Sequence, residues 1–193
     1  MLRSPIAIEM KQIKLLKDES KTYGGELLRT RKGRSGPRPI DTRNTMHMVL
    51  RSSKAVKDWS FKRPTNEKKI SEVVAKFSIR YGVKIISLAN VGNYLHFHIK
   101  LTNRYSYKPF IRAVTSAIVM AITGTSRWKL PKKEDKIKFW DYRPFTRVIK
   151  SFRALLNLKD YLRINELEGY GCSRTEARFI LASPHFIRAR VPI

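Results

Sequence analysis

Residues 93 to 101 read Asn93-Tyr94-Leu95-His96-Phe97-His98-Ile99-Lys100-Leu101, a run in which polar and apolar side chains alternate. This alternation predicts a β-strand, because successive side chains of a strand point to opposite faces of the sheet. One face of the predicted strand is apolar and carries Leu95, Phe97, Ile99 and Leu101. The other face carries Tyr94, His96, His98 and Lys100. We therefore expect a strand that buries one face in a core and presents two imidazoles together on the other.

The paired histidines indicate a possible metal site. Imidazole is the commonest metal ligand among side chains, and two imidazoles on one strand face can converge on one cation. Two ligands do not complete a site, so a third has to come from elsewhere in the chain. A His-x-His pattern on a strand also occurs without a metal, and the residues alone leave that alternative open. His47, on a separate predicted strand, is interpreted as structural and left outside the metal site.

The composition predicts a basic, folded protein. The 193 residues, 42% of them hydrophobic, are enough for one compact domain with extensions. Lys and Arg number 41 against 15 Asp and Glu, which gives a formal net charge of +26. So large an excess favours a polyanionic partner. Nucleic acid is the first candidate, because each neutralised phosphate releases counterions, and a membrane surface is the weaker alternative.

Targeting signals and cysteines narrow the class further. No apolar run approaches the roughly 20 residues that span a bilayer, and the N-terminus lacks the pattern of a secretory signal. We therefore expect a cytoplasmic protein with no membrane partner. Cys172 is the only cysteine, which excludes an internal disulfide and a cysteine-based zinc site within the chain.

The N-terminal segment, residues 1–44, shows little apolar periodicity and is interpreted as a basic arm. Its cations are concentrated between Leu28 and Pro39, among glycines and prolines, and are Arg29, Arg31, Lys32, Arg34 and Arg38. Two alternatives stay open for this arm. It is either a solvated tail or a segment that lies along a phosphate backbone.

The following residues predict a strand–helix–strand–strand order. Residues 45–50 form a short strand. Thr65 or Asn66 can cap a helix that ends at Gly82, and residues 83–89 form a hairpin with the histidine strand. Ser106 can cap a second helix, which ends at Gly124. This order predicts a split β-α-β sheet, with both helices on the apolar face and the histidine face open to a substrate.

The segment Phe139-Trp140-Asp141-Tyr142-Arg143 alternates aromatic and charged residues. In a basic chain such aromatic side chains can stack on unpaired bases while the cations hold phosphates. The alternative for Trp140 is packing on the core, because tryptophan is usually largely buried.

A third helix is predicted from Ser151 to about Leu167, with Phe152, Leu155 and Leu162 on its apolar side. Tyr161 and Asn165, four residues apart, share another face of this helix. Two glycines, Gly169 and Gly171, end it. The run Ser173-Arg174-Thr175-Glu176 is a capping box that opens a last short helix toward Leu181.

These residues can supply the parts of a DNA-cleaving enzyme. Such an enzyme needs a nucleophile, a cation to offset charge on the phosphate, and a way to hold the leaving group. A tyrosine can attack phosphorus and keep the energy of the broken phosphodiester bond in a phosphotyrosine ester. Neither the histidine pair nor the tyrosine is specific alone, but their joint occurrence in a chain of charge +26 is a stronger indication.

The same motifs resemble those of a known family. The run from Asn93 to His98 resembles the His-hydrophobic-His signature of HUH endonucleases. Tyr161-Leu162-Arg163-Ile164-Asn165 resembles the tyrosine helix of their single-tyrosine branch, the REP-associated tyrosine transposases in particular. Residues 46–51 are similar to the family's first strand, and residues 139–144 to the segment before its tyrosine helix. The family's usual Asn-Pro after the tyrosine is Asn165-Glu166 here.

The resemblance implies a ferredoxin-like α+β domain over residues 45–168, followed by a C-terminal helix and tail over 169–193. In it, His96, His98 and Asn165 would hold Mg²⁺ or Mn²⁺. Tyr161 would cleave single-stranded DNA beside a palindromic REP-type hairpin, leaving a 5′-phosphotyrosine link and a free 3′-hydroxyl. The protein would be a monomer or homodimer associated with the bacterial nucleoid. The residues expected to contact DNA are Arg29, Arg31, Lys32, Arg34, Arg38, Arg51, Trp140 and Arg143.

A second hypothesis from another class stays open. The chain could keep the fold and the charge and bind single-stranded or structured nucleic acid without cleaving it. Composition does not separate the two hypotheses.

Overall fold

The computed structural model describes residues 38–125 and 138–183 of the chain. Its elements, in chain order, are β1 (Thr45–Arg51), α1 (Pro64–Tyr81), β2 (Val83–Asn90), β3 (Tyr94–Leu101), α2 (Tyr107–Thr123), β4 (Phe145–Ile149), α3 (Phe152–Gly169) and α4 (Arg174–Ala182). Short 3-10 helices, Lys57–Trp59 and Arg104–Ser106, precede α1 and α2. The predicted arm residues Arg29, Arg31, Lys32 and Arg34 lie outside the described residues.

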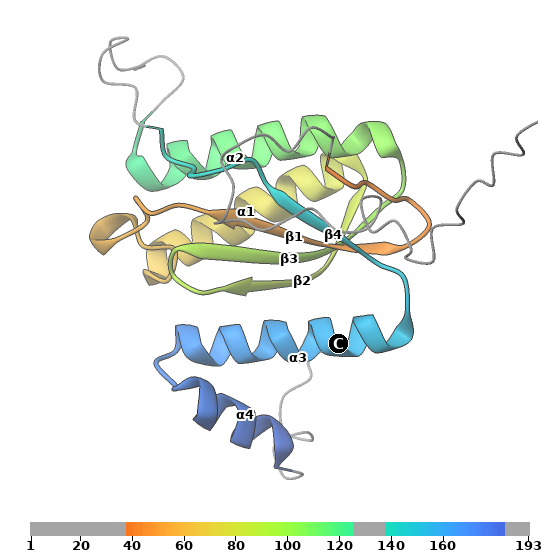
Figure 1. Ribbon diagram of the computed structural model, residues 1–193. Helices are drawn as coiled ribbons and strands as arrows, with labels where there is room; N and C mark the ends of the chain where they lie inside the picture. Colours follow the sequence, from red (N-terminus) through yellow and green to blue (C-terminus); the bar gives the residue numbers. More distant parts are fainter. Residues whose placement is uncertain (1–37, 126–137, 184–193) are drawn as a thin grey trace, which may run out of the picture.

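The four strands form one antiparallel sheet in the order β2-β3-β1-β4 (Figure 1). The two central strands are β1 and β3, so the predicted histidine strand has a neighbour on each side. This arrangement confirms the predicted α+β class and the antiparallel hairpin of β2 and β3. The strand β4 was not predicted from the sequence. It has only five residues with a central arginine, Arg147, and such a short run has little periodic signal.

The apolar face of the sheet packs against α1 and α2. The sheet and these two helices together form the main core. All four apolar residues of β3 are fully buried, as the alternation predicted: Leu95, Phe97, Ile99 and Leu101 each have 0% of their surface exposed. The helices contribute Ile70 and Val74 from α1 and Phe110, Val114 and Ile118 from α2. Burial of this face fixes the strand register, because a slip of one residue would turn every apolar side chain outward.

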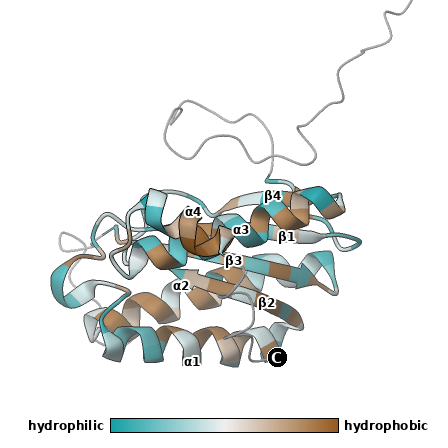
Figure 2. Cartoon of the chain, turned by 90° about the horizontal axis from the view of Figure 1, so that it is seen from below, coloured by the Kyte–Doolittle hydropathy of each residue, from teal (hydrophilic) through white to brown (hydrophobic). Residues whose placement is uncertain are grey.

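The histidine face of the sheet is covered by α3, and this corrects the prediction that it stays open. Figure 1 shows α3 on the opposite side of the sheet from α1 and α2, and Figure 2 shows α3 and α4 in front of the strands when the molecule is seen from below. A second, small core forms here, in which Leu158 and Leu162 of α3 pack with Ala89 and Ile149. The predicted apolar side of this helix was partly wrong, since Phe152 is 74% exposed.

Several predicted helix ends are confirmed. Gly82 and Gly124 follow α1 and α2 in the left-handed conformation, with φ of 61° and 69°, which a glycine adopts without strain. The side chain of Ser151 accepts a hydrogen bond from the Ala154 amide at the start of α3. The capping box between Ser173 and Glu176 is present at the start of α4.

One predicted cap is wrong, and another lacks its hydrogen bond. Helix α1 begins at Pro64 and not after Thr65 or Asn66, and the Asn66 side chain instead donates hydrogen bonds to the carbonyls of Asp58 and Ser60. Proline is favoured at the first position of a helix, where a backbone N–H would have no partner. At the start of α2, Ser106 is the N-cap residue as predicted, but its side chain makes no cap hydrogen bond.

The C-terminal end of α3 crosses the β2–β3 turn at very short range. A Cβ atom added to Gly169 would lie 2.9 Å from the carbonyl oxygen of Asn90 and 3.2 Å from the Cα of Val91. These are backbone atoms, which cannot rotate away as a flexible side chain can. Glycine is therefore the residue that lets this end of the helix approach the sheet.

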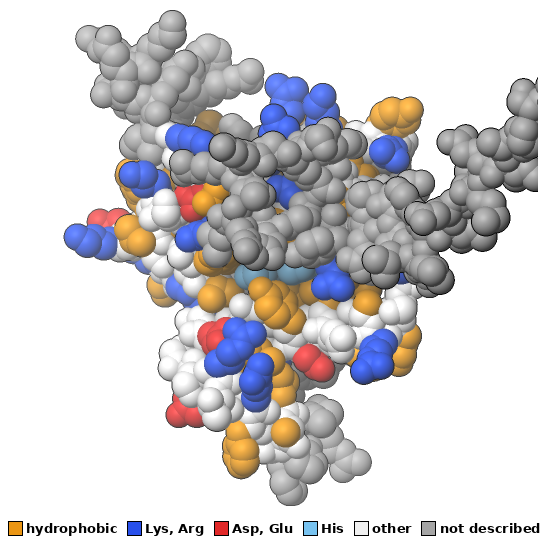
Figure 3. Space-filling model, viewed as in Figure 1, with side chains coloured by type: hydrophobic (Ala, Val, Ile, Leu, Met, Phe, Trp, Pro, Cys, Tyr) orange, Lys and Arg blue, Asp and Glu red, His pale blue; other side chains and the backbone are white. Residues whose placement is uncertain are grey.

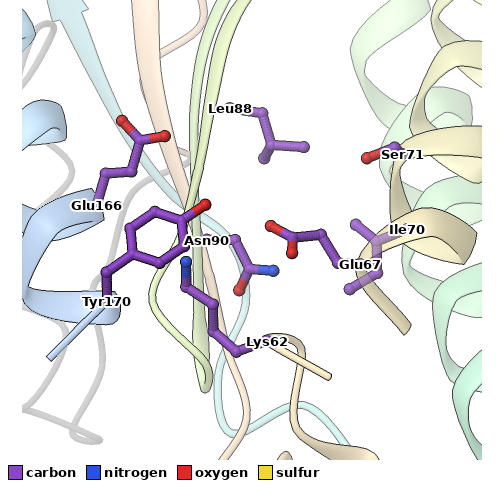
Figure 4. A pocket seen from close by; sticks show the side chains of 8 residues that line it. All are labelled: Lys62, Glu67, Ile70, Ser71, Leu88, Asn90, Glu166 and Tyr170. Carbon is purple, nitrogen blue, oxygen red and sulfur yellow. The ribbon is translucent and has the colours of Figure 1, made fainter. Parts of the chain in front are cut away.

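A cavity of about 70 Å³ lies beside this contact, between α1, β2 and the end of α3 (Figure 4). Its walls are formed by Lys62, Glu67, Ile70, Ser71, Leu88, Asn90, Glu166 and Tyr170. The ammonium group of Lys62 lies 3.2 Å from the centre of the Tyr170 ring, a cation–π contact between the loop before α1 and the residue after α3. No histidine lines this cavity, so it is separate from the histidine face.

Among the described helices, none is long and apolar enough to cross a membrane.

Candidate functional site

Three histidines lie together on the face beneath α3. In the strand register, His98 of β3 lies opposite His47 of β1, and His47 lies opposite Arg147 of β4. His96 is in the neighbouring row, opposite Val49. On the other side of β3, the register with β2 is irregular between Ile85 and Ser87, and Ser87 lies opposite His98. Such irregularities change the direction in which side chains point and are frequent beside functional sites.

The histidine side chains are buried and uncharged at neutral pH. Their exposed fractions are 7% for His47, 4% for His96 and 2% for His98. Burial lowers the pKa of His47 from 6.5 to about 3, with smaller contributions from the charges of His96, His98 and Arg147. Burial also lowers the pKa of His96 to about 4. For His98 the pKa is lowered by burial and then by the positive charge of Lys159 on α3. Neutral imidazole is the form that binds a cation.

His47 contacts His96 directly, so the structural interpretation of this histidine places it beside the pair. The Nε2 atom of His47 lies 3.3 Å from the Nδ1 atom of His96. The two rings are within 13° of parallel, and their centres are 5.5 Å apart. The two nitrogens are therefore closer to each other than the two ring centres are, because each nitrogen lies on the edge of its ring that faces the other ring.

Tyr161 of α3 lies against this histidine pair. Its ring centre is 5.5 Å from that of His96 and 5.7 Å from that of His47, and both contacts are edge to face, with interplanar angles of 77° and 71°. The tyrosine side chain is 37% exposed. Burial raises the pKa of its hydroxyl, and a hydrogen bond from the side chain of Asn165 opposes that rise. The helix expected to bring Tyr161 to the histidines thus does so.

Asn165 is buried, with 8% of its surface exposed, on the same side of α3 as Leu158 and Leu162. This differs from the prediction that it lies away from the apolar stripe. Its Nδ2 atom donates a hydrogen bond of 2.6 Å to the Tyr161 carbonyl one helical turn earlier. The amide therefore uses its nitrogen within the helix, and Oδ1 is the atom that could bind a cation.

One donor atom beneath α3 has the surroundings expected of a ligand to a divalent cation. The Nε2 atom of His98 is buried and has no hydrogen-bond partner among the described residues. A buried polar atom without a partner costs roughly 1–3 kcal/mol, and a cation would remove this cost. No group of three or more His, Cys, Asp or Glu side chains within the described parts of the chain could hold a metal. The candidate set implied by the family resemblance has two imidazoles and the Asn165 amide oxygen, with the other positions left to water or substrate oxygens.

Arg51, one of the residues expected to contact DNA, has partners within the protein. Its Nε atom pairs with the Asp141 carboxylate at 3.2 Å, and its guanidinium lies 5.0 Å from the centre of the Tyr94 ring. Tyr94 in turn lies beside His96, with ring centres 5.8 Å apart. The Nη1 atom of Arg51 is buried without a hydrogen-bond partner among the described residues. This arginine thus lies next to the histidine face with donor capacity to spare.

Trp140 follows its packing alternative. It contacts Phe61 and Phe139, and its Nε1 atom donates a hydrogen bond to the Thr115 carbonyl at 3.1 Å. These contacts attach the aromatic segment to the main core through α2. Its stacking on DNA bases stays an untested prediction.

The other expected DNA contacts differ in exposure. Arg143 is exposed, and the guanidinium of Arg38 lies 5.9 Å from the centre of the Phe145 ring. Figure 3 shows Lys and Arg side chains distributed around the described surface on the side from which the histidines are visible. Lys159 could not be selected from the sequence, because only the packing of α3 brings its charge near His98.

Comparisons with known proteins support the fold. The structure is similar to that of a REP-associated tyrosine transposase bound to a REP hairpin, with a TM-score of 0.53 and 13% identity over 69% of this chain and 72% of that one. A protein of Deinococcus radiodurans R1 described as a transposase matches with a TM-score of 0.40 and 13% identity, over 71% of this chain and 98% of that one. No protein-family model and no curated protein sequence matches the chain.

The first of these similarities covers more than two thirds of each chain. It confirms the resemblance at the level of fold, and the described domain has the fold of a REP-associated tyrosine transposase.

Proposed function

We propose that the protein is a metal-dependent endonuclease and strand transferase that acts on single-stranded DNA beside a hairpin through a covalent bond to Tyr161. The observation that carries this proposal is the position of the Tyr161 ring, 5.5 Å from the ring of His96, a residue 65 positions earlier in the chain. The solved transposase of similar fold is bound to a REP hairpin, which makes such hairpins the first substrate to test. Such a protein would act in the cytoplasm, on nucleoid DNA.

The cation would be held by His96, His98 and the Oδ1 atom of Asn165, and would supply positive charge next to the scissile phosphate. Both Mn²⁺ and Mg²⁺ prefer carboxylate ligands to imidazole ligands. Of the two ions, Mn²⁺ accepts imidazole more readily. We therefore expect stronger activity with Mn²⁺ than with Mg²⁺.

Tyr161 would be the nucleophile. Its Oη atom would attack phosphorus while the bond from phosphorus to the 3′ oxygen of the preceding nucleotide breaks. The phenol would lose its proton, and the departing oxygen would take up a proton to become a free 3′-hydroxyl. The protein would keep the 5′ phosphate as a phosphotyrosine ester, and attack by a 3′-hydroxyl on that ester would rejoin DNA. Because burial raises the pKa of the hydroxyl, nearby positive charge is needed to stabilise the phenolate.

Positive side chains near the site would hold the DNA backbone. Arg51, paired with Asp141 beside the histidine face, would add positive charge next to a bound phosphate. The exposed Arg143 and the cations of the N-terminal arm would add contacts to phosphates.

The experiment is to incubate the protein with a hairpin-bearing single strand and Mn²⁺ and to look for a covalent adduct on a denaturing gel. We expect the Tyr161→Phe variant to form no adduct. Tyr170→Phe is the matched control, because Tyr170 directly follows the same helix but lines the separate cavity, and this variant should form the adduct normally. An adduct that survives in Tyr161→Phe would show that another group is the nucleophile.

A protein that binds the hairpin but forms no adduct under any metal condition would favour the non-catalytic nucleic-acid-binding alternative. The double variant His96→Ala/His98→Ala supplies a second comparison. If all products form unchanged in it, the proposed metal site is wrong.

A further inference from the structure

The hydrogen bond between His47 and His96 restricts how His96 can bind a cation. Their facing atoms, Nε2 of His47 and Nδ1 of His96, are 3.3 Å apart. Both rings are buried and neutral. In a neutral imidazole one ring nitrogen carries a hydrogen and the other is an acceptor, so two arrangements of this hydrogen bond exist.

In the first arrangement His96 donates from Nδ1 to Nε2 of His47. The Nε2 atom of His96 then has a free lone pair. In the second arrangement His47 donates from Nε2 to Nδ1 of His96. The hydrogen of His96 is then on Nε2, and its Nδ1 lone pair is already occupied, so His96 has no lone pair left for a cation.

We propose that His47 is a positioning residue for the metal site: it accepts the hydrogen bond from Nδ1 of His96 and so holds His96 in the tautomer whose Nε2 atom binds the cation. This inference rests on the metal site of the proposed function and assigns to that site a fourth residue, on β1. Metal-binding histidines commonly donate their second ring N–H to an acceptor that fixes the tautomer and ring orientation.

Two substitutions of His47 separate the hydrogen bond from the packing of the ring. His47→Phe keeps an aromatic ring against Tyr161 and Phe145, which the His47 ring contacts at centre distances of 5.7 and 6.2 Å, but has no acceptor. His47→Gln loses the ring, but its amide oxygen can accept from His96. If packing of the ring sets the affinity for the cation, His47→Phe should lower that affinity less than His47→Gln. If the hydrogen bond sets it, His47→Gln should lower it less than His47→Phe.

The first measurement is the affinity of the full-length protein for Mn²⁺ alone, by titration followed with electron paramagnetic resonance. We expect His47→Gln to stay within a few-fold of wild type and His47→Phe to bind about 10- to 100-fold more weakly, the usual effect of losing such a partner. Circular dichroism melting of each variant shows whether it is folded. Unchanged binding in His47→Phe, or equal losses in both variants, would overturn the proposal.

The second measurement identifies the tautomer and the ligands. In protein labelled with ¹⁵N-histidine and loaded with Mg²⁺, long-range ¹H–¹⁵N spectra should show the His96 hydrogen on Nδ1, and a hydrogen on Nε2 would contradict the proposal. Electron spin echo spectra with Mn²⁺ should show two coordinated histidine nitrogens. A third would make His47 a ligand, which would also refute a positioning role.

The inference and the proposed function can fail separately. If the wild type forms the Tyr161 adduct but His47→Phe binds Mn²⁺ as tightly as wild type, the role of His47 is wrong and the function stands. If the variants order as expected in Mn²⁺ binding but no DNA is cleaved, the metal site stands and the function is wrong. Wild-type protein that binds no Mn²⁺ at millimolar concentration would overturn both.

Discussion

At the scale of single residues, the histidine face combines three imidazoles with almost no exposed surface. Such burial makes the charged form of each ring unfavourable, because a cation loses hydration when it leaves water. The rings therefore remain neutral well below the usual pKa of histidine, with values of about 3 for His47 and about 4 for His96. The same burial that keeps the rings neutral makes the fold sensitive to acid.

We predict that the metal-free protein loses stability as the pH falls. Because the folded pKa of His96 is below its unfolded value of 6.5, the unfolded chain binds more protons between these values. The stabilising contribution is complete above about pH 6.5 and is lost as the pH falls toward about 4, by on the order of 3 kcal/mol for His96 alone. The measurement is urea unfolding with a chelator at a series of pH values.

The control for this acid effect is His47→Gln, which removes one buried titrating ring. Its free energy of unfolding should depend less on pH between 4 and 6.5 than that of the wild type. An equal dependence in both proteins would assign the acid sensitivity to carboxylates elsewhere in the chain.

The sequence was sufficient for the strand that carries the histidines but not for their partner. A period of two is a local property, so the two faces of β3 could be predicted from residues 94–101. The contact of His47 with His96 depends on which residues of β1 and β3 lie opposite each other, and that register is set by the whole sheet. Without that register, the sequence placed His47 on a strand but could not show which residues lie beside it.

At the scale of elements, the site depends on how α3 docks on the sheet. Its middle is attached by Leu158 and Leu162, and its C-terminal end by the close approach of Gly169 to the β2–β3 turn. The face of α3 that packs was harder to predict than the helix itself. Phe152, the first residue of the helix, is exposed, and Asn165 is buried although its side chain is polar. Apolar periodicity cannot anticipate a buried amide.

We predict that Gly169→Ala displaces this helix. The new Cβ would lie 2.9 Å from the Asn90 carbonyl oxygen, so the end of α3 has to move, at a cost of about 1–3 kcal/mol by analogy with overpacked cores. The adduct at Tyr161 should form more slowly, because its ring is placed by the same helix. The measurements are urea unfolding and the hairpin cleavage assay.

Asn157→Ala is the matched control for the glycine substitution, since Asn157 is exposed on the same helix. It should leave both stability and adduct formation near the wild-type values. If Gly169→Ala behaves like this control, the close approach at the turn does not position the helix.

At the scale of the whole molecule, the protein has a net charge of +26, and its sheet separates two surfaces that carry this charge. Helices α1 and α2 close one side, and the tyrosine helix covers the other (Figure 1). On the proposed function, positive charge on the side of α3 would contact a DNA strand at the site, whereas charge on the outer face of α1 would act only at a distance. Charge that contacts phosphate releases counterions, and distant charge does so much less.

We therefore predict that DNA affinity falls steeply with salt and that the N-terminal arm accounts for part of the slope. For single-stranded DNA each neutralised phosphate contributes about 0.7 to the slope of log K against log salt concentration. The triple variant Arg29→Ala/Arg31→Ala/Arg34→Ala should reduce this slope by about 2 if all three cations contact phosphates. Fluorescence anisotropy with a labelled hairpin strand, at salt concentrations from about 50 to about 200 mM, measures it.

The control removes the same number of charges from α1, which lies on the side of the sheet opposite α3. Lys68, Lys76 and Arg80 are exposed on α1, and changing all three to alanine alters the net charge equally. If the arm lies along the DNA backbone, only the arm variant lowers the slope, and the α1 variant changes affinity slightly with an unchanged slope. Equal slopes in both variants would mean that the arm is a solvated tail and that the molecule attracts DNA through its total charge.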